Sequence, residues 1–173
     1  MDIRSRLLKF LGVFSIVLLI SFSSASILYY SLKTINGYSP FACPVAWSCW
    51  PYWDKYPIPY LAVLSFSYSL SCTLWAIIFA TKPKKYWAFQ YVSLPITALL
   101  FGGYLSGIVW AYQDMQLGFF PAFSQAIYYT KGFAISGLLL SLPTALASFP
   151  LNILAYIVSI IISLGVKNIL IKG

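Results

Sequence analysis

Long runs of apolar residues, separated by short clusters of polar or charged residues, divide the chain into four segments. They cover residues 10–30, 59–81, 86–112 and 137–166. Each run reaches the ~20 residues that a helix needs to cross a ~30 Å hydrocarbon core. A lone strand would leave its backbone polar groups unsatisfied in lipid, so helices are predicted. The pattern predicts an all-α integral membrane protein, with four transmembrane helices in a single transmembrane domain, residues 1–173.

The first run has a second interpretation. Basic residues precede it, its centre is rich in leucine, and small residues follow at 23–26. This is also the pattern of a cleavable secretory signal. Because the apolar character continues through residues 27–30, past the expected cleavage point, we favour an uncleaved anchor. Cleavage of residues 1–26 is the alternative.

Serines recur through the second run at a helical spacing. Ser65 with Ser69, and Ser67 with Ser71, form two rows in which the residues are four apart. Residues at this spacing lie on one face of a helix. Hydroxyl groups inside a membrane commonly hydrogen-bond to neighbouring helices. We therefore expect both rows to face other helices.

Small residues gather in the third run at Gly102, Gly103, Ser106 and Gly107. The spacing of Gly103 and Gly107 is the small-xxx-small pattern, which allows another backbone to approach closely. We expect this set to pack against a helix of the same chain. A helix of a partner chain is the alternative.

The last run contains Pro143 and Pro150 and is too long for one perpendicular helix. Two crossings would need a hairpin almost without turn residues. A proline inside a helix removes a backbone donor and clashes with the preceding turn. We therefore predict one long, tilted helix over 137–166, kinked at the prolines, with an aromatic segment before it at the outer interface.

Basic residues are distributed unevenly between the two ends of these runs. Eight of the eleven precede the first run, separate the second from the third, or follow the last: Arg4, Arg6, Lys9, Lys82, Lys84, Lys85, Lys167 and Lys172. The other three are Lys33, Lys55 and Lys131. The positive-inside rule then predicts that both termini are cytoplasmic (N-in/C-in) and that residues 31–58 and 113–136 are outer loops. The expected location is the cell membrane, inner or plasma, with several passes.

Composition supports the membrane assignment. The chain is 61% hydrophobic and 8% charged, about a third of the charged fraction of a soluble domain. Its net charge of +8 could indicate nucleic acid in a soluble protein. Here the topology accounts for the positions of the basic residues, so we predict no nucleic-acid partner.

Several kinds of chemistry are excluded by the residues that the sequence lacks. There is no histidine and no glutamate, and the acidic side chains are Asp2, Asp54 and Asp114. This excludes histidine-ligated haem, the usual zinc sites and triads built on a histidine base. No ionisable residue lies deep in a run, where proton relays and ion pathways need one. We predict no catalytic residue, no metal and no cofactor.

The loop after the first run contains two cysteines, Cys43 and Cys49, separated by five residues. On the oxidising side of the membrane such a pair can persist as a disulfide. We predict a structural disulfide, with free thiols or a redox function as alternatives. Cys72 lies within the second run and is expected to be a buried, inert thiol.

Aromatic residues gather where the outer loops meet the predicted spans. The predicted interface belt consists of Trp47, Trp50, Trp53, Tyr56, Trp110 and Tyr112. Tryptophan and tyrosine are enriched at membrane interfaces because their rings are apolar and their N–H or O–H groups are polar. Prolines stiffen the first outer loop, so it could also present a surface to a partner.

Three functions are compatible with this pattern. The leading hypothesis is a membrane protein without enzymatic chemistry that acts by contact, as an accessory subunit or an immunity- or exclusion-type protein. Its partners would be membrane lipid and possibly another membrane protein. One alternative is a membrane thiol-disulfide oxidoreductase that uses Cys43 and Cys49. Another is a lipid or small-molecule transporter component that uses the kinked last helix and the small face of the third.

Overall fold

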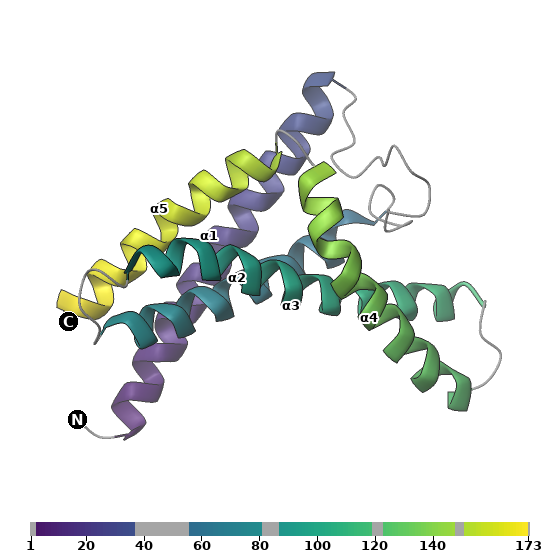
Figure 1. Ribbon diagram of the computed structural model, residues 1–173, viewed down its shortest axis with the longest axis horizontal. Coiled ribbons are helices and arrows are strands. Elements are labelled where there is room, and N and C mark those ends of the chain that lie inside the picture. The colour runs from purple at the N-terminus through teal and green to yellow at the C-terminus, as the bar shows by residue number, and fades with distance from the viewer. Residues whose placement is uncertain (1–2, 37–55, 81–86, 119–122, 148–150, 173) are drawn as a thin grey trace.

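The structure, a computed structural model, describes residues 3–36, 56–80, 87–118, 123–147 and 151–172. These residues form five helices and define an all-α protein (Figure 1). The helices are α1 (Ile3–Asn36), α2 (Pro57–Ala80), α3 (Trp87–Gln116), α4 (Phe123–Ala147) and α5 (Leu151–Lys172).

Two helices occupy the region in which one was predicted. Helix α4 ends at Ala147 and α5 begins at Leu151, so the prediction of one long, proline-kinked helix over 137–166 is wrong. The described residues therefore form five helices where four were predicted, and the four membrane crossings stay a prediction. The physical reason lies in Pro150. A residue that precedes proline avoids the helical conformation, whereas proline is well tolerated where a helix starts. A complete break is therefore favoured over a kink.

The loop boundaries also differ from the prediction. Helix α3 continues to Gln116 and α4 begins at Phe123, so most of the predicted outer loop 113–136 is helical. Gly118 has a φ of +80°, and its backbone N–H donates to the carbonyl of Met115 at 3.1 Å. Glycine adopts this left-handed conformation without steric cost and commonly ends a helix in this way.

Three helical stretches are long and apolar enough to cross a membrane, within the part of the chain that the structure describes. They are Phe10–Ser31, Pro57–Phe79 and Ala88–Gln116, which correspond to the first three predicted spans. Helix α5 adds a shorter apolar stretch, Asn152–Val166. The chain is a multi-pass membrane protein. Which side holds the termini, and how many times the chain crosses, stay predictions.

The helices pack mainly as neighbours in sequence, with α5 returning to the first two. Helix α2 packs against α1 and α3, α4 packs mainly against α3, and α5 packs against α1 and α2. Figure 1 shows α4 crossing the middle of α3, with the start of α1 and the end of α5 at the same end of the molecule. The predicted topology requires that common end.

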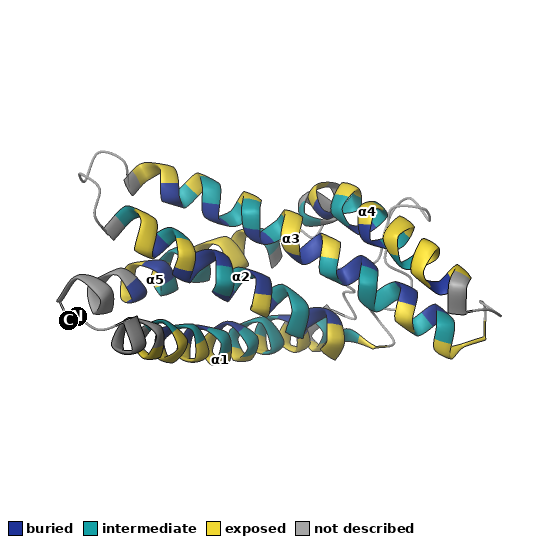
Figure 2. Cartoon of the chain, turned by 90° about the horizontal axis from the view of Figure 1, so that it is seen from below, coloured by how far each residue is buried: buried dark blue, intermediate teal, exposed yellow. Residues whose placement is uncertain are grey.

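Buried side chains form two clusters along the bundle. The first joins α1, α2, α3 and α5 through Val13, Val17, Cys72, Ala76, Leu94 and Val166. The second joins α1 and α2 through Tyr29, Tyr60 and Leu61, with Trp110 of α3 against it. The outer faces of the helices are exposed and largely apolar, as lipid contact requires (Figure 2).

Candidate functional site

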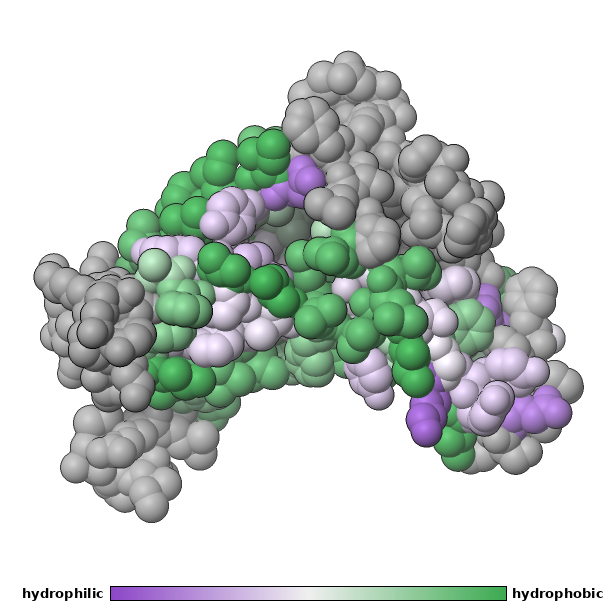
Figure 3. All heavy atoms as spheres, in the orientation of Figure 1, coloured by the Kyte–Doolittle hydropathy of each residue, from purple (hydrophilic) through white to green (hydrophobic). Residues whose placement is uncertain are grey.

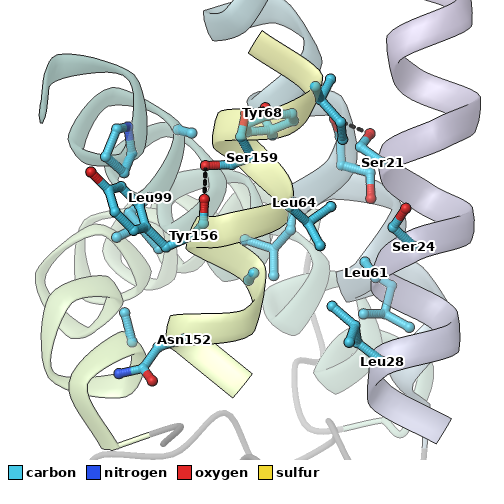
Figure 4. Close-up of a pocket in the computed structure, with 18 of the residues that line it drawn as sticks. Ser21, Ser24, Leu28, Leu61, Leu64, Tyr68, Leu99, Asn152, Tyr156 and Ser159 are labelled. Atoms are coloured by element: carbon cyan, nitrogen blue, oxygen red, sulfur yellow. Dashed lines mark hydrogen bonds between the residues drawn. The ribbon is translucent and has the colours of Figure 1, made fainter. Parts of the chain in front are cut away.

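A cavity of about 260 Å³ lies between the two buried clusters. Apolar side chains make most of its wall, including Leu28, Leu61, Leu64, Leu99, Val158 and Ile162. Figure 4 shows Leu28, Leu61 and Leu64 between α1 and α5. The space-filling view shows the surface hollowed between α5 and the crossing of α3 with α4 (Figure 3). The cavity borders all five helices of the described residues.

Small side chains leave this space open. Ala25, Ala98, Ala145 and Ala155 line the cavity from α1, α3, α4 and α5 respectively. Protein interiors are normally packed to crystal-like density, with few voids larger than a water molecule. A larger residue at these positions would fill the gap, so the four alanines together make the cavity possible.

Pro95 also lines the cavity and lies inside α3. Proline has no N–H to donate to the carbonyl four residues earlier, which here belongs to Tyr91. The hydroxyl of Tyr156 on α5 donates to that carbonyl at 3.4 Å. The missing helical hydrogen bond in α3 therefore becomes an attachment point for α5 beside the cavity.

Ser65 differs from the other hydroxyl residues of α2. Ser67, Ser69 and Thr73 each donate to a carbonyl four residues earlier in the same helix, at 2.7, 2.7 and 2.8 Å. Ser65 is only 3% exposed and lines the cavity, yet its Oγ has no hydrogen-bond partner among the described residues. A buried hydroxyl without a partner costs about 1–3 kcal/mol. Ser65 therefore borders the cavity, while its unpartnered Oγ is buried with almost no accessible surface.

A second serine contact joins α1 to α2 beside the cavity. The Oγ of Ser21 lies 3.1 Å from the Oγ of Ser69 and donates to the carbonyl of Ser65 at 3.4 Å. The prediction that the Ser65 and Ser69 row faces another helix is confirmed. In the second row, Ser67 uses its hydroxyl within α2 and lies against Gly102 of α3.

The remaining polar groups of the wall are neutral. Tyr68 donates to the carbonyl of Ser159 at 2.6 Å, and the Asn152 Oδ1 accepts from the Ile153 N–H at 2.8 Å. None of the described residues that line the cavity carries a carboxylate, amine or guanidinium group. The site therefore has the chemistry to hold an uncharged, mainly apolar molecule, and it presents no acid–base pair or nucleophile.

Cys72 lies one helical turn beyond Tyr68 and outside the cavity wall. It is fully buried as a free thiol, beside Tyr68 and Ser163. The amide of Gln90 donates to the Oγ of Ser163 at 2.8 Å. The prediction of a buried thiol at Cys72 is confirmed.

The predicted disulfide residues, Cys43 and Cys49, lie outside the described residues, and no disulfide occurs within the described ranges. The disulfide therefore stays a prediction. No group of three possible metal ligands occurs in the described ranges either.

The four small residues of α3 lie between two helices. A Cβ added at Gly102 would lie 2.6 Å from Leu64 of α2, and one added at Gly103 would lie 2.5 Å from the carbonyl oxygen of Gly137 on α4. Gly107 meets the backbone of Phe133 on α4 even more closely. Ser106 between them is fully buried.

The opposite side of this crossing was not singled out from the sequence. Gly137 and Ser141 of α4 both contact Gly103, and the two residues are four apart. The same small-xxx-small spacing was therefore present in α4 and could have indicated the partner face.

The predicted belt residues fall into three groups. Trp47, Trp50 and Trp53 lie outside the described residues. Tyr56 and Tyr112 are exposed. Trp110 is partly buried and packs against the ring of Phe133, with 4.6 Å between the ring centroids. The belt stays a prediction, and Trp110 has a packing role in addition.

The fold and the apolar spans define the class as a small multi-pass helical membrane protein. Comparison of the chain with known protein families, curated proteins and solved structures finds no match.

Proposed function

We propose that this membrane protein binds one uncharged apolar molecule, a lipid or lipid-like compound, in the cavity between its helices. The observation that supports this is the cavity itself, with its volume of about 260 Å³ and its apolar wall. A methylene group occupies ~30 Å³, similar to a water molecule, so the cavity has room for roughly nine methylene groups. This is a larger space than the ~150 Å³ cavity that accepts benzene, and slightly smaller than drug-sized sites.

The cost of an empty cavity supports the same proposal. A residual void costs about 24 cal/mol per Å³, so an enclosed space of 260 Å³ would cost about 6 kcal/mol. This is comparable with the whole stability of a typical domain. The cavity is partly open, which lowers the cost but also gives a molecule from the bilayer a way in. An occupant of matching polarity removes the penalty.

This function belongs to the class of the lipid or small-molecule transporter component that the sequence left as an alternative. It requires no catalytic group. The binding wall is built from α1, α2, α3, α4 and α5 together. A relative shift of α4 and α5, which are separate helices, would change the size of the cavity.

Photolabelling with a ten-carbon alkyl diazirine tests the proposal. Purified protein in mild detergent should be labelled at cavity residues such as Leu64, Leu99 and Ile162. Ala155→Phe places a large side chain in the cavity wall and should reduce this labelling several-fold. Ala88→Phe is the matched control, because Ala88 is exposed and does not line the cavity. Equal labelling in the wild type and Ala155→Phe, with both proteins folded, would contradict the proposal.

A second candidate is the leading sequence hypothesis, contact with another membrane protein. It is favoured by the position of α4, which packs mainly against α3 and leaves Ile127, Tyr128 and Leu139 exposed. Affinity purification from gentle detergent tests it, since a stoichiometric partner would support contact. A monodisperse monomer under several detergents would count against it.

A further inference from the structure

We propose that a groove between α3 and α4 binds one anionic phospholipid, with its phosphate beside Lys131 and an acyl chain along α3. The groove has a volume of about 360 Å³. It lies where α3 and α4 diverge from their crossing, toward the end of α3 and the start of α4 (Figure 1). The groove shares no lining residue with the cavity between the helices, so this proposal is independent of the proposed function.

Small side chains line the groove between larger ones. Ala126, Thr130 and Ala134 follow one another at four-residue spacing on α4, so they share one face of that helix, and both alanines are buried. Tyr104 on α3 and Ile127 on α4 also line the groove, and both are exposed. Buried small residues between exposed large ones leave room for a chain-shaped apolar molecule.

The length of the groove matches one leaflet of a membrane. The apolar stretch of α3, Ala88–Gln116, has its middle at Gly102. The groove follows α3 from Met115, one residue before the end of that stretch, to Tyr104, two residues from its middle. These eleven positions cover about 16.5 Å of helix, and half of a ~30 Å hydrocarbon core is ~15 Å. The groove therefore has the length of a single acyl chain layer.

Lys131 provides a positive charge in the wall of this groove. The sequence pattern predicted a loop over 113–136, whereas Lys131 lies inside α4, eight residues after Phe123. Its side chain is exposed, and it forms no salt bridge with a described residue. Asp114, the only acidic residue in the described ranges, does not line the groove. Because a charge beside lipid tails is costly, an anion brought by the lipid itself stabilises this arrangement.

The direction of α4 allows Lys131 to reach the head-group region. Gly103 of α3 contacts Gly137 of α4, and Gly107, one turn further along α3, contacts Phe133, one turn earlier on α4. The two helices therefore run antiparallel at their crossing, and the start of α4 lies at the same end as the end of α3. Side chains of a helix tilt toward its N-terminus, so Lys131 leans toward that end. Lysines at such positions extend the ammonium group to the membrane interface, where lipid phosphates lie.

The combination of one cation and an apolar groove selects an anionic amphiphile. A lysine ammonium is a compact charge with three donors, which suits a phosphate. A soluble phosphate would leave the apolar walls uncovered. A zwitterionic lipid brings its own cation beside its phosphate, so it gains less from Lys131 than a lipid with a net negative charge.

Lipid titration followed by native mass spectrometry tests the proposal on the full chain in mild detergent. The probes are phosphatidylglycerol and phosphatidylcholine with identical acyl chains, and glycerol phosphate as the soluble anion. We expect the first phosphatidylglycerol molecule to bind with a Kd about fivefold lower than that of phosphatidylcholine, the effect of one basic residue near a membrane surface. Glycerol phosphate should neither bind nor displace the lipid.

Three lysine variants test the role of the charge. Lys131→Gln should bring the two lipids to the same Kd while leaving that of phosphatidylcholine unchanged, and Lys131→Arg should keep the preference. Lys33→Gln is the matched control, because it removes the same charge from α1 and Lys33 does not line the groove. It should leave the preference for phosphatidylglycerol intact.

A phosphatidylglycerol with a diazirine near the end of one acyl chain locates the bound lipid. It should label Tyr104, near the middle of the apolar stretch of α3, and label it less in Lys131→Gln. Equal affinity of the wild type for both lipids, an unchanged preference in Lys131→Gln, or labelling only outside the groove would overturn the proposal. Displacement of the lipid by glycerol phosphate would show a site for any phosphate and would also overturn it. Each of these outcomes leaves the cavity between the helices untouched.

Discussion

The hydroxyl of Tyr156 on α5 donates to the backbone carbonyl of Tyr91 on α3, across 3.4 Å and 65 residues of sequence. The carbonyl is available because Pro95, four residues later, has no N–H. This contact holds α5 against α3, beside the cavity.

A double-mutant cycle on this contact should show coupling. Tyr156→Phe removes the donor and should lower the free energy of unfolding by about 0.5–1.5 kcal/mol. In a Pro95→Ala background this loss of unfolding free energy should be smaller, because the backbone N–H of the alanine can donate to the Tyr91 carbonyl in place of Tyr156. Reversible unfolding in mixed micelles measures both values. The same loss in both backgrounds would show that the effect of Tyr156 does not depend on the missing N–H of Pro95.

The α3–α4 crossing makes a prediction about glycine. A Cβ at Gly137 would collide with the carbonyl oxygen of Gly103 and lie 2.8 Å from the backbone nitrogen of Gly107. Since a backbone cannot move aside as a flexible side chain can, Gly137→Ala should destabilise the protein by about 1–3 kcal/mol. Gly103→Leu should cost more. Thermal unfolding in detergent measures the effect.

Gly132→Ala is the control for that measurement. Gly132 lies on the same helix, and nothing lies within 4 Å of an added Cβ. The substitution should leave stability unchanged or raise it by up to ~1 kcal/mol through helix propensity. If Gly137→Ala behaved like Gly132→Ala, the two helices would not be in backbone contact.

Thiol counting tests the three cysteines separately. The native protein should react with no maleimide group, because Cys72 is fully buried and Cys43 and Cys49 are expected to be bonded. Unfolding in SDS without reductant should expose one thiol, and reduction should raise the count to three. Intact-protein mass spectrometry gives each count. Three labels without reductant would contradict the disulfide.

Fusion reporters test the topology. The positions of the basic residues predict a cytoplasmic C-terminus. A reporter placed after Gly173 should be active only in its cytoplasmic form, and one placed after Asn36 only in its external form. The opposite pattern would reverse the orientation. External activity at both positions would contradict the cytoplasmic C-terminus and show an odd number of crossings, in which either both or neither of α4 and α5 crosses the membrane.

The sequence by itself determined the membrane class and three apolar helices. Each depends on local properties: the runs 10–30, 59–81 and 86–112 are apolar and long enough whatever they contact. It also pointed to Gly103 and Gly107, since small residues four apart share one face of a helix. The pattern over 137–166 was interpreted as one kinked helix, although the restriction that Pro150 places on the residue before it favours the break between Ala147 and Leu151.

Only the tertiary structure decided that there is a cavity, and that the hydroxyls of Ser65 and Ser106 have no partner among the described residues. Ala25, Ala98 and Ala155 come from three helices far apart in sequence. The sequence pattern cannot distinguish an alanine that packs tightly from one that borders a cavity. Ser65 and Ser69 look equivalent in the pattern of residues. They differ because the hydroxyl of Ser69 meets Ser21 on α1 while that of Ser65 meets nothing in the described residues. A hydroxyl can find a partner in its own helix, as Ser67 does, or in a neighbouring helix, and only the packing of the bundle decides the second.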